Sequence, residues 1–173
     1  EGRCRCSNDE RLQCCIVMAQ MKYLVLHCTA TKEGREVTSD EIRHWHTDPV
    51  SKGGRGWKQV GYTDMIHLDG KVERLVKNNE DAEVDPWEIT NGAAGFNSVS
   101  RHVVYVGGLA SDGKTAKDTR TDAQKKALTE YVRNFHERFP SIRIIGHNEL
   151  NSHKACPSFN VQEWLRSIGI KQV

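Results

Sequence analysis

The sequence lacks an excess of charge of either sign, and it lacks a long apolar run. Its 25 basic and 23 acidic residues leave a net charge of +2 over 173 residues. Proteins dedicated to nucleic acids normally carry a strong basic excess, so we expect no nucleic-acid partner. The apolar runs are as short as Tyr23-Leu24-Val25-Leu26, far below the roughly 20 residues of a membrane-spanning helix. We therefore expect no membrane span and a monomeric chain.

The start of the chain has no charged segment followed by an apolar stretch, so we expect no signal peptide and synthesis in the cytoplasm. Instead it holds a group of cysteines with the pattern C-x-C-x7-C-C, namely Cys4, Cys6, Cys14 and Cys15. This is not a good zinc-finger spacing. We interpret residues 1–20 as a cysteine-rich leader of unknown role and residues 21–173 as the catalytic domain. A small metal-binding knuckle is the alternative for the leader.

Strand and helix signals alternate along the rest of the chain. Residues 22–27, "KYLVLH", are too short an apolar run for a helix and indicate a buried strand. "SRHVVYVGG" and "IRIIGH" indicate two more strands, and Asp69-Gly70 between two alternating segments predicts a hairpin.

Helix starts are marked by capping residues. Thr38 with Glu41 and Thr121 with Gln124 form capping-box patterns, and Asn160 begins a last helix that Gly169 closes. In the second helix Ala127, Leu128, Tyr131, Val132 and Phe135 share one face. These elements predict an α/β fold, a single domain with a central mixed β-sheet flanked by helices. Residues 78–88, with five acidic residues and no basic one, are predicted to be a solvated loop.

Two predicted strands each end in a histidine, His27 and His147. If the strands are parallel neighbours, both imidazoles emerge at one edge of the sheet, where ligands of open α/β sheets tend to bind. Cys156 precedes a proline and should be extended, which would point Lys154 and Cys156 into the same site. His27, His147 and Cys156 then predict a Zn²⁺ site with an open fourth position, as in catalytic zinc centres. Cys28 leaves its strand on the opposite face and is expected to be a free buried cysteine.

Hydrolysis at such a site needs groups that stabilise an oxyanion and transfer a proton. Lys154, beside the thiol, is the candidate electrophile. Tyr62 follows Gly61 at the start of the strand that leads into the hairpin. If that strand runs antiparallel to the other two, its beginning lies near the metal. An ordinary solvated lysine and a boundary tyrosine are the alternatives for these two residues.

An ordered set of segments now supports a resemblance: "LHCTAT", "EIRHWH", "VGYTDMI", "NGAAGFNSVS", "VYVGG" and "GHNELNSHKACPSF". From about Lys22 to about Ile168 the chain resembles the zinc-dependent N-acetylmuramoyl-L-alanine amidases, in particular the amidase-type phage lysozymes, whose fold is shared with peptidoglycan recognition proteins. The resemblance implies that His27, His147 and Cys156 bind zinc and that Tyr62 and Lys154 assist catalysis. It implies a peptidoglycan substrate, cut between N-acetylmuramic acid and L-alanine, and action on the cell wall.

Three positions depart from that family's pattern. The stretch between His147 and Cys156 is one residue longer than in the phage enzymes. Thr63 replaces a histidine found in many relatives, and Asp64 replaces an aromatic residue, which puts substrate contacts there in doubt. None of the three changes removes a ligand.

Other polar residues are interpreted as ordinary surface groups. His44 and His46 stand two apart on a helix and do not share a face. His153 should be exposed, and Glu149 is either a loop carboxylate or a contact behind the site. The basic residues Lys114, Lys117, Arg120, Lys125 and Lys126 are expected to be solvated.

Two other functions remain open from the sequence. One is a module of the same fold that recognises peptidoglycan without cutting it. The other is a cysteine hydrolase that uses Cys156 or Cys28, although Pro157 would remove a backbone donor beside Cys156.

Overall fold

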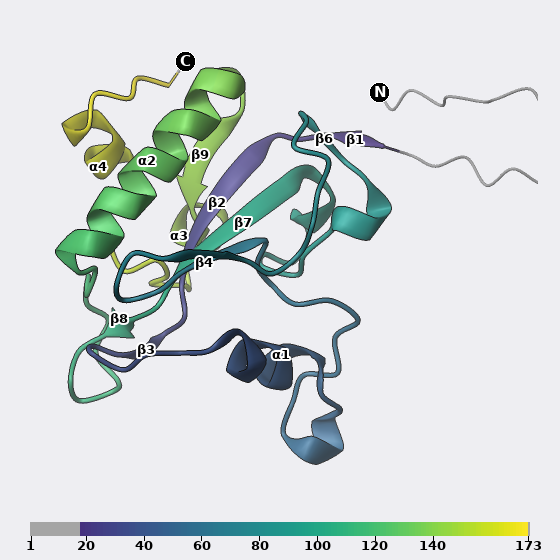
Figure 1. Ribbon diagram of the computed structural model, residues 1–173, viewed down its shortest axis with the longest axis vertical. Helices are drawn as coiled ribbons and strands as arrows, with labels where there is room; N and C mark the ends of the chain where they lie inside the picture. Colours follow the sequence, from purple (N-terminus) through teal and green to yellow (C-terminus); the bar gives the residue numbers. More distant parts are fainter. Residues whose placement is uncertain (1–17, 173) are drawn as a thin grey trace, which may run out of the picture.

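A five-stranded sheet forms the centre of the computed structural model, which describes residues 18–172 (Figure 1). The strand order is β5-β4-β7-β2-β9. The first four strands from the β9 edge, β9, β2, β7 and β4, run parallel, and β5 runs antiparallel at the other edge. The sheet is therefore mixed, as predicted. Its strands are β2 (Tyr23–Cys28), β4 (Asp64–Ile66), β5 (Val72–Arg74), β7 (Ser100–Tyr105) and β9 (Arg143–Gly146).

Two short strand pairs extend this sheet at its margins. β1 (Ala19–Gln20) pairs antiparallel with β6 (Glu83–Val84), and β3 (Thr31–Lys32) pairs parallel with β8 (Gly108–Leu109). The folded part of the chain thus reaches back to Ala19. The division into a leader and a domain at residue 20 stays a prediction, and the four cysteines of that segment lie outside the described residues.

The helices begin where the sequence places capping residues. They are α1 (Ser39–Thr47), α2 (Asp122–Arg138), α3 (His147–Leu150) and α4 (Val161–Ser167), with 3-10 turns η1 (Val50–Lys52), η2 (Pro86–Glu88) and η3 (Asn97–Val99). Thr38 and Thr121 each form a complete capping box, and Asn160 accepts a hydrogen bond from the backbone N–H of Glu163. The predicted starts of α1, α2 and α4 are confirmed. Satisfying the free N–H groups of the first turn fixes these starts locally.

Helices cover both faces of the sheet, and each face has its own core. α2 and α4 pack on one face, against side chains that include Leu24, Leu26 and Val103 (Figure 1). The smaller core on the other face joins Ile42 of α1 to Met65 of β4 and Val104 of β7. Successive strand residues point to opposite faces. His27 and His102 therefore lie on the α1 side.

The predicted hairpin is present. β4 and β5 pair with Asp64 opposite Arg74, and Gly70 in the connecting loop has a φ of +87°, which favours glycine. Since β4 is parallel to β7, however, the strand that follows Tyr62 does not run antiparallel to the strands of the site. The expectation built on that direction is wrong.

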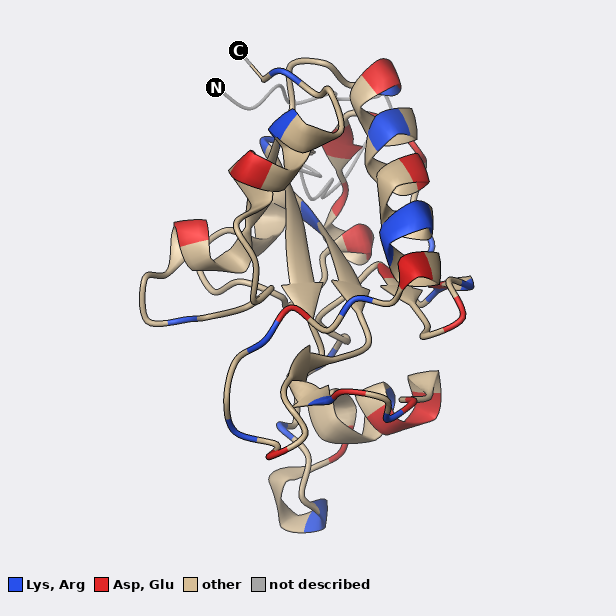
Figure 2. Cartoon of the chain, turned by 90° about the vertical axis from the view of Figure 1, so that its left-hand side faces the viewer, with Lys and Arg blue, Asp and Glu red and all other residues tan. Residues whose placement is uncertain are grey.

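Charged residues of both signs alternate along α2, and its basic residues Lys125 and Lys126 are exposed, as predicted (Figure 2). Arg120 is a correction. Its side chain is only 5% exposed, lies over the ring of Phe159 with Cζ 3.5 Å from the centroid, and binds Asp118. Stacking on an aromatic face explains why this guanidinium is buried.

The acidic segment 78–88 is likewise only partly solvated. Asp85 and Glu88 are buried because they cap η2 and bind Asn79, whereas Glu80 forms ion pairs with Arg74 and Arg138. A capping role draws a carboxylate inward that composition alone assigns to solvent. Among residues 18–172, no helix is both long and apolar enough to cross a membrane.

Candidate metal centre and active site

Parallel pairing of β2 with β9 brings His27 and His147 together. Leu26 lies opposite Gly146 in this pairing, so the residue after each of them is a histidine at the same edge of the sheet. The two imidazole centroids are 4.8 Å apart. His27 is still within β2, whereas His147 is the first residue of α3, whose capping carboxylate Glu149 accepts a hydrogen bond from Gly146 N–H at 2.6 Å. Glu149 therefore supports the strand end behind His147.

Cys156 reaches the same place from a turn. Ser158 N–H donates to Ala155 O at 2.7 Å, and the Cys156-Pro157 peptide bond is cis. The expectation of an extended segment is thus wrong, because a cis proline at the third position closes a tight turn. The Sγ atom of Cys156 lies 3.6 Å from His27 Nδ1 and accepts a hydrogen bond from Cys28 N–H at 3.2 Å. One ligand atom from each of His27, His147 and Cys156 lies within 4.8 Å of the others.

Cys28 is buried and points to the other face of the sheet, as expected, where it packs in the larger core. Its thiol is still in contact with that of Cys156. The hydrogen bond with Cys156 lowers the pKa of Cys28 to about 7. The same hydrogen bond and burial raise the pKa of Cys156. Since only the thiolate is a good metal ligand, a cation at Cys156 would have to displace this proton.

The buried histidines of the site are neutral. Burial, and then the neighbouring His102, His147 and His46, lower the pKa of His27 well below its ordinary value. Burial followed by the charge of Lys154 lowers the pKa of His147. A neutral imidazole has one nitrogen with a free lone pair, which is the form that binds metals.

Tyr62 lies beside His27 although the strand argument for it fails. Its ring centroid is 5.3 Å from that of His27 and 5.3 Å from that of His46. The segment before β4 crosses the sheet face, where Thr63 N–H donates to His102 O at 2.8 Å, and this places Tyr62 over the face instead of beyond the strand ends. Burial raises the pKa of the Tyr62 hydroxyl, which therefore stays protonated.

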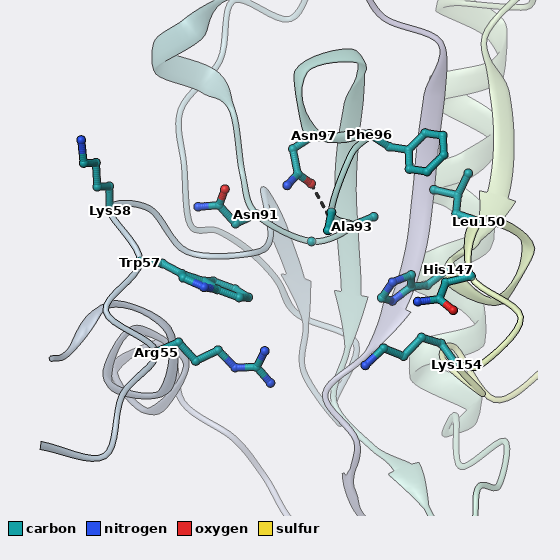
Figure 3. A pocket seen from close by; sticks show the side chains of 13 residues that line it. Arg55, Trp57, Lys58, Asn91, Ala93, Phe96, Asn97, His147, Leu150 and Lys154 are labelled. Atoms are coloured by element: carbon teal, nitrogen blue, oxygen red, sulfur yellow. Dashed lines mark hydrogen bonds between the residues drawn. The ribbon is translucent and has the colours of Figure 1, made fainter. Parts of the chain in front are cut away.

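Lys154 is exposed and lines the cleft that also contains His147 (Figure 3). Its ammonium group and the guanidinium of Arg55 project into this cleft from opposite sides. A part of about 430 Å³ holds His27, Tyr62 and Cys156, and a neighbouring part of about 560 Å³ holds Phe96. Both parts share Arg55, Trp57, Asn91, Gly92, His147 and Lys154.

His46 is another correction, because it is buried rather than on the surface. Its Nδ1 accepts a hydrogen bond from Gly61 N–H at 3.0 Å, and its ring packs on Trp57 and Tyr62. Burial lowers its pKa to about 4. His44 and His153 are exposed, as predicted.

Sequence reasoning missed His102 and Asn97. His102 is fully buried in β7, and its Nδ1 lies 2.8 Å from His27 Nε2. Burial, and then the charge of His147, lower the pKa of His102 to about 3. The available signal was an imidazole in the middle of an otherwise apolar strand, which needs a polar partner when buried.

The fold and this cluster define an α/β domain with a candidate metal centre in a cleft at the end of its parallel strands. Comparison with known proteins makes this more specific. Residues 18–159 match the N-acetylmuramoyl-L-alanine amidase family. The chain is 33% identical over 142 residues to the endolysin of Enterobacteria phage K11, covering 82% of this chain and 83% of that one.

Solved structures give the same picture. The Ph2119 endolysin, from a Thermus scotoductus MAT2119 bacteriophage, superposes with a TM-score of 0.63 at 26% identity, over 98% of this chain and 90% of that one. Bumblebee PGRP-SA shares the fold alone, with a TM-score of 0.61 at 18% identity over 96% of this chain and 92% of that one.

The chain belongs to the N-acetylmuramoyl-L-alanine amidase family. Its activity is hydrolysis of the amide bond between N-acetylmuramic acid and L-alanine in peptidoglycan. The resemblance read from the ordered sequence segments is confirmed.

Proposed function

We propose that this amidase is zinc-dependent, with His27, His147 and Cys156 as the metal ligands and Tyr62 and Lys154 as catalytic residues. The observation that carries the proposal is the convergence of two imidazoles and one thiol, from three separate segments, within 4.8 Å. A nitrogen and sulfur donor set of this kind is typical of zinc.

The spacing of the donors also fits the ion. Zn–N bonds of about 2.0–2.1 Å and a Zn–S bond of about 2.3 Å at a tetrahedral angle give an N···S separation of about 3.6 Å. His27 Nδ1 and Cys156 Sγ are separated by 3.6 Å. His147 is half-buried at the start of a four-residue helix, so a modest rotation of its ring would bring the third donor to the same distance.

Three protein ligands leave one coordination position for chemistry. Within residues 18–172 no further His, Cys, Asp or Glu joins this cluster, and the cleft opens beside it. When bound there, zinc would acidify a water molecule and polarise the scissile carbonyl.

Tyr62 and Lys154 supply the remaining groups for amide hydrolysis. The Tyr62 hydroxyl, protonated because it is buried, donates a hydrogen bond toward the reacting water or carbonyl. The Lys154 ammonium group beside His147 stabilises negative charge that develops on the carbonyl oxygen.

The lining of the cleft suits a peptidoglycan strand with its stem peptide. Around the part shown in Figure 3 stand the cationic Arg55, Lys58 and Lys154, with no acidic residue among the lining side chains. Such a lining attracts a peptide that carries carboxylates. The aromatic faces of Trp57 and Phe96 offer apolar contacts to sugar rings. By analogy with its endolysin relatives, we assign the chain to lysis of the bacterial cell wall.

The test combines zinc analysis with product identification. Purified cell wall is incubated with the protein with and without a chelator, and new ends are identified by mass spectrometry. Free L-alanine amino termini that disappear on chelation and return with zinc are the expected result. Binding without new ends would point to a recognition module. Activity that survives chelation but is lost on thiol alkylation would point to a cysteine hydrolase.

A further inference from the structure

A chain of hydrogen bonds extends from His27 away from the metal cluster. His27 Nδ1 faces Cys156 Sγ, whereas Nε2 on the other side of the ring lies 2.8 Å from His102 Nδ1. His102 Nε2 in turn lies 3.1 Å from the side-chain oxygen Oδ1 of Asn97. Both imidazoles are almost entirely removed from solvent. Each ring nitrogen of this pair therefore has a defined neighbour.

The far end of the chain fixes the direction of every bond in it. Asn97 Oδ1 accepts a hydrogen bond from the backbone N–H of Ala93 at 2.9 Å (Figure 3). Because a backbone N–H only donates, the atom that faces it is the amide oxygen and not the amide nitrogen. His102 Nε2 faces the same oxygen and must carry a proton.

Protonation of His102 at Nε2 determines the state of His27. A neutral His102 with its proton on Nε2 has a bare Nδ1, which accepts a hydrogen bond. His27 Nε2 is then the donor, and His27 Nδ1 keeps its lone pair on the side of Cys156. A doubly protonated His102 would be a fully buried cation, and its hydrogen-bond partners are two neutral side chains, which is costly.

The His102 ring is held in this position by its surroundings. A Cβ atom at Gly92 would come within 2.5 Å of His102 Nδ1 and 2.6 Å of Cγ, so the glycine backbone packs directly on the ring. The carbonyl of His102 accepts the hydrogen bond from Thr63 N–H. The ring thus has little freedom to rotate away from His27.

We infer that His102 and Asn97 are positioning residues that hold His27 as the Nε2-protonated tautomer, so that its Nδ1 lone pair faces the metal cluster. The inference rests on the proposed function, since a bare Nδ1 matters there only if a metal binds. Partners behind the metal ligands commonly set the tautomer and orientation of ligating histidines. Neither residue touches the substrate cleft through the nitrogen atoms used here, so their effect passes through His27.

The direct test is the tautomer of His27 in the chelator-treated protein, measured by long-range nitrogen–proton correlation NMR on histidine-labelled protein. The expected spectrum shows protonated Nε2 and bare Nδ1 for both His27 and His102. A proton on His27 Nδ1, or equal populations of the two tautomers, would overturn the inference. This measurement needs no metal, so it decides the inference even if zinc binding, and with it the proposed function, fails.

Two variants of His102 separate hydrogen bonding from packing. His102→Phe keeps a ring but removes the acceptor, and we expect zinc affinity, measured by competition with a chelator, to fall about 10- to 100-fold. His102→Asn places an amide oxygen where Nδ1 was and should recover most of that loss. His44→Asn, an exposed control, should bind zinc as the parent protein does. Equal zinc affinity in His102→Phe and the parent, or equal losses in the Phe and Asn variants, would contradict the inference.

The other end of the chain gives a second test that leaves the core intact. Asn97→Ala removes the oxygen acceptor at a half-buried position, whereas Asn97→Asp keeps an oxygen that accepts from both neighbours. We expect a mixed His27 tautomer population in Asn97→Ala and the Nε2-protonated form in Asn97→Asp. An unchanged single tautomer in Asn97→Ala would count against the assigned role of Asn97.

Discussion

Gly92→Ala adds one methyl group at the point where the backbone meets the His102 ring. Glycine is not needed at this position for its backbone angles, because its φ lies outside the left-handed region. The added Cβ would stand 2.5 Å from His102 Nδ1 and 2.7 Å from the carbonyl oxygen of Gly61. Ordinary contact begins at 3.4 Å, so the ring or the backbone has to move by about 0.9 Å.

A shift of that size has two measurable consequences. Overpacking of this kind costs about 1–3 kcal/mol, which lowers Tm by about 2–12 °C in a chain of this length. If the ring takes up the shift, the 2.8 Å contact between His27 Nε2 and His102 Nδ1 lengthens by as much as 0.9 Å, beyond hydrogen-bond range. We then expect zinc affinity to fall about 10- to 100-fold.

Thermal unfolding in chelator and zinc competition measure the two effects separately. Gly95→Ala is the matched control, because Gly95 has a φ of +86° and no atom would lie within 4 Å of its Cβ. That variant should lose about 1–2 kcal/mol from backbone strain and keep its zinc affinity. The reasoning is refuted if Gly92→Ala binds zinc as tightly as Gly95→Ala does.

Three further predictions concern the ligands, the catalytic residues and acid stability. Cys156→Ser should lower zinc affinity by more than about 100-fold, since even groups behind a ligand contribute 10- to 100-fold. Cys28→Ala, its buried neighbour, should keep zinc, and metal analysis that finds equal losses would contradict the ligand assignment. Lys154→Ala and Tyr62→Phe should retain zinc while kcat falls about 10²- to 10³-fold; full activity in either variant would remove that residue from the mechanism. Because burial lowers the pKa of His46 to about 4, the unfolded chain takes up a proton near pH 6.5 that the folded chain refuses. Stability in chelator should therefore fall as pH drops from about 6.5 to 4. Denaturant unfolding should show a shallower fall in His46→Gln, and an identical slope would count against this account.

Local signals predicted the elements of the fold. Capping boxes at Thr38 and Thr121 mark helix starts because the side chain that satisfies the first free N–H groups lies only three residues from its partner. The juxtaposition of His27 and His147 was also predictable, since parallel neighbouring strands end at one edge.

Features that depend on long-range pairing were not predictable. The direction of β4 is set by its pairing with β7, some forty residues further along the chain, and the sequence around Tyr62 carries no trace of it. The depth of His46 depends on contact with Trp57 and Tyr62 after the chain has turned back over α1. Tertiary contacts, and not periodicity, decide such cases.

The hydrogen-bonded pair behind the metal cluster shows the same limit. An imidazole at position 102 is conspicuous in an apolar strand, but its partner His27 is 75 residues away and Asn97 lies in the preceding 3-10 turn. The register of β2 with β7, which places His102 opposite Val25, is what brings the rings together. Only the folded sheet supplies that register.

X-ray absorption at the zinc edge of the zinc-loaded protein tests the central claim most directly. The account predicts a four-coordinate ion with two imidazole nitrogens, one sulfur and one light atom from solvent. A second sulfur in the ligand shell, or a fourth protein ligand that fills the open position, would contradict it.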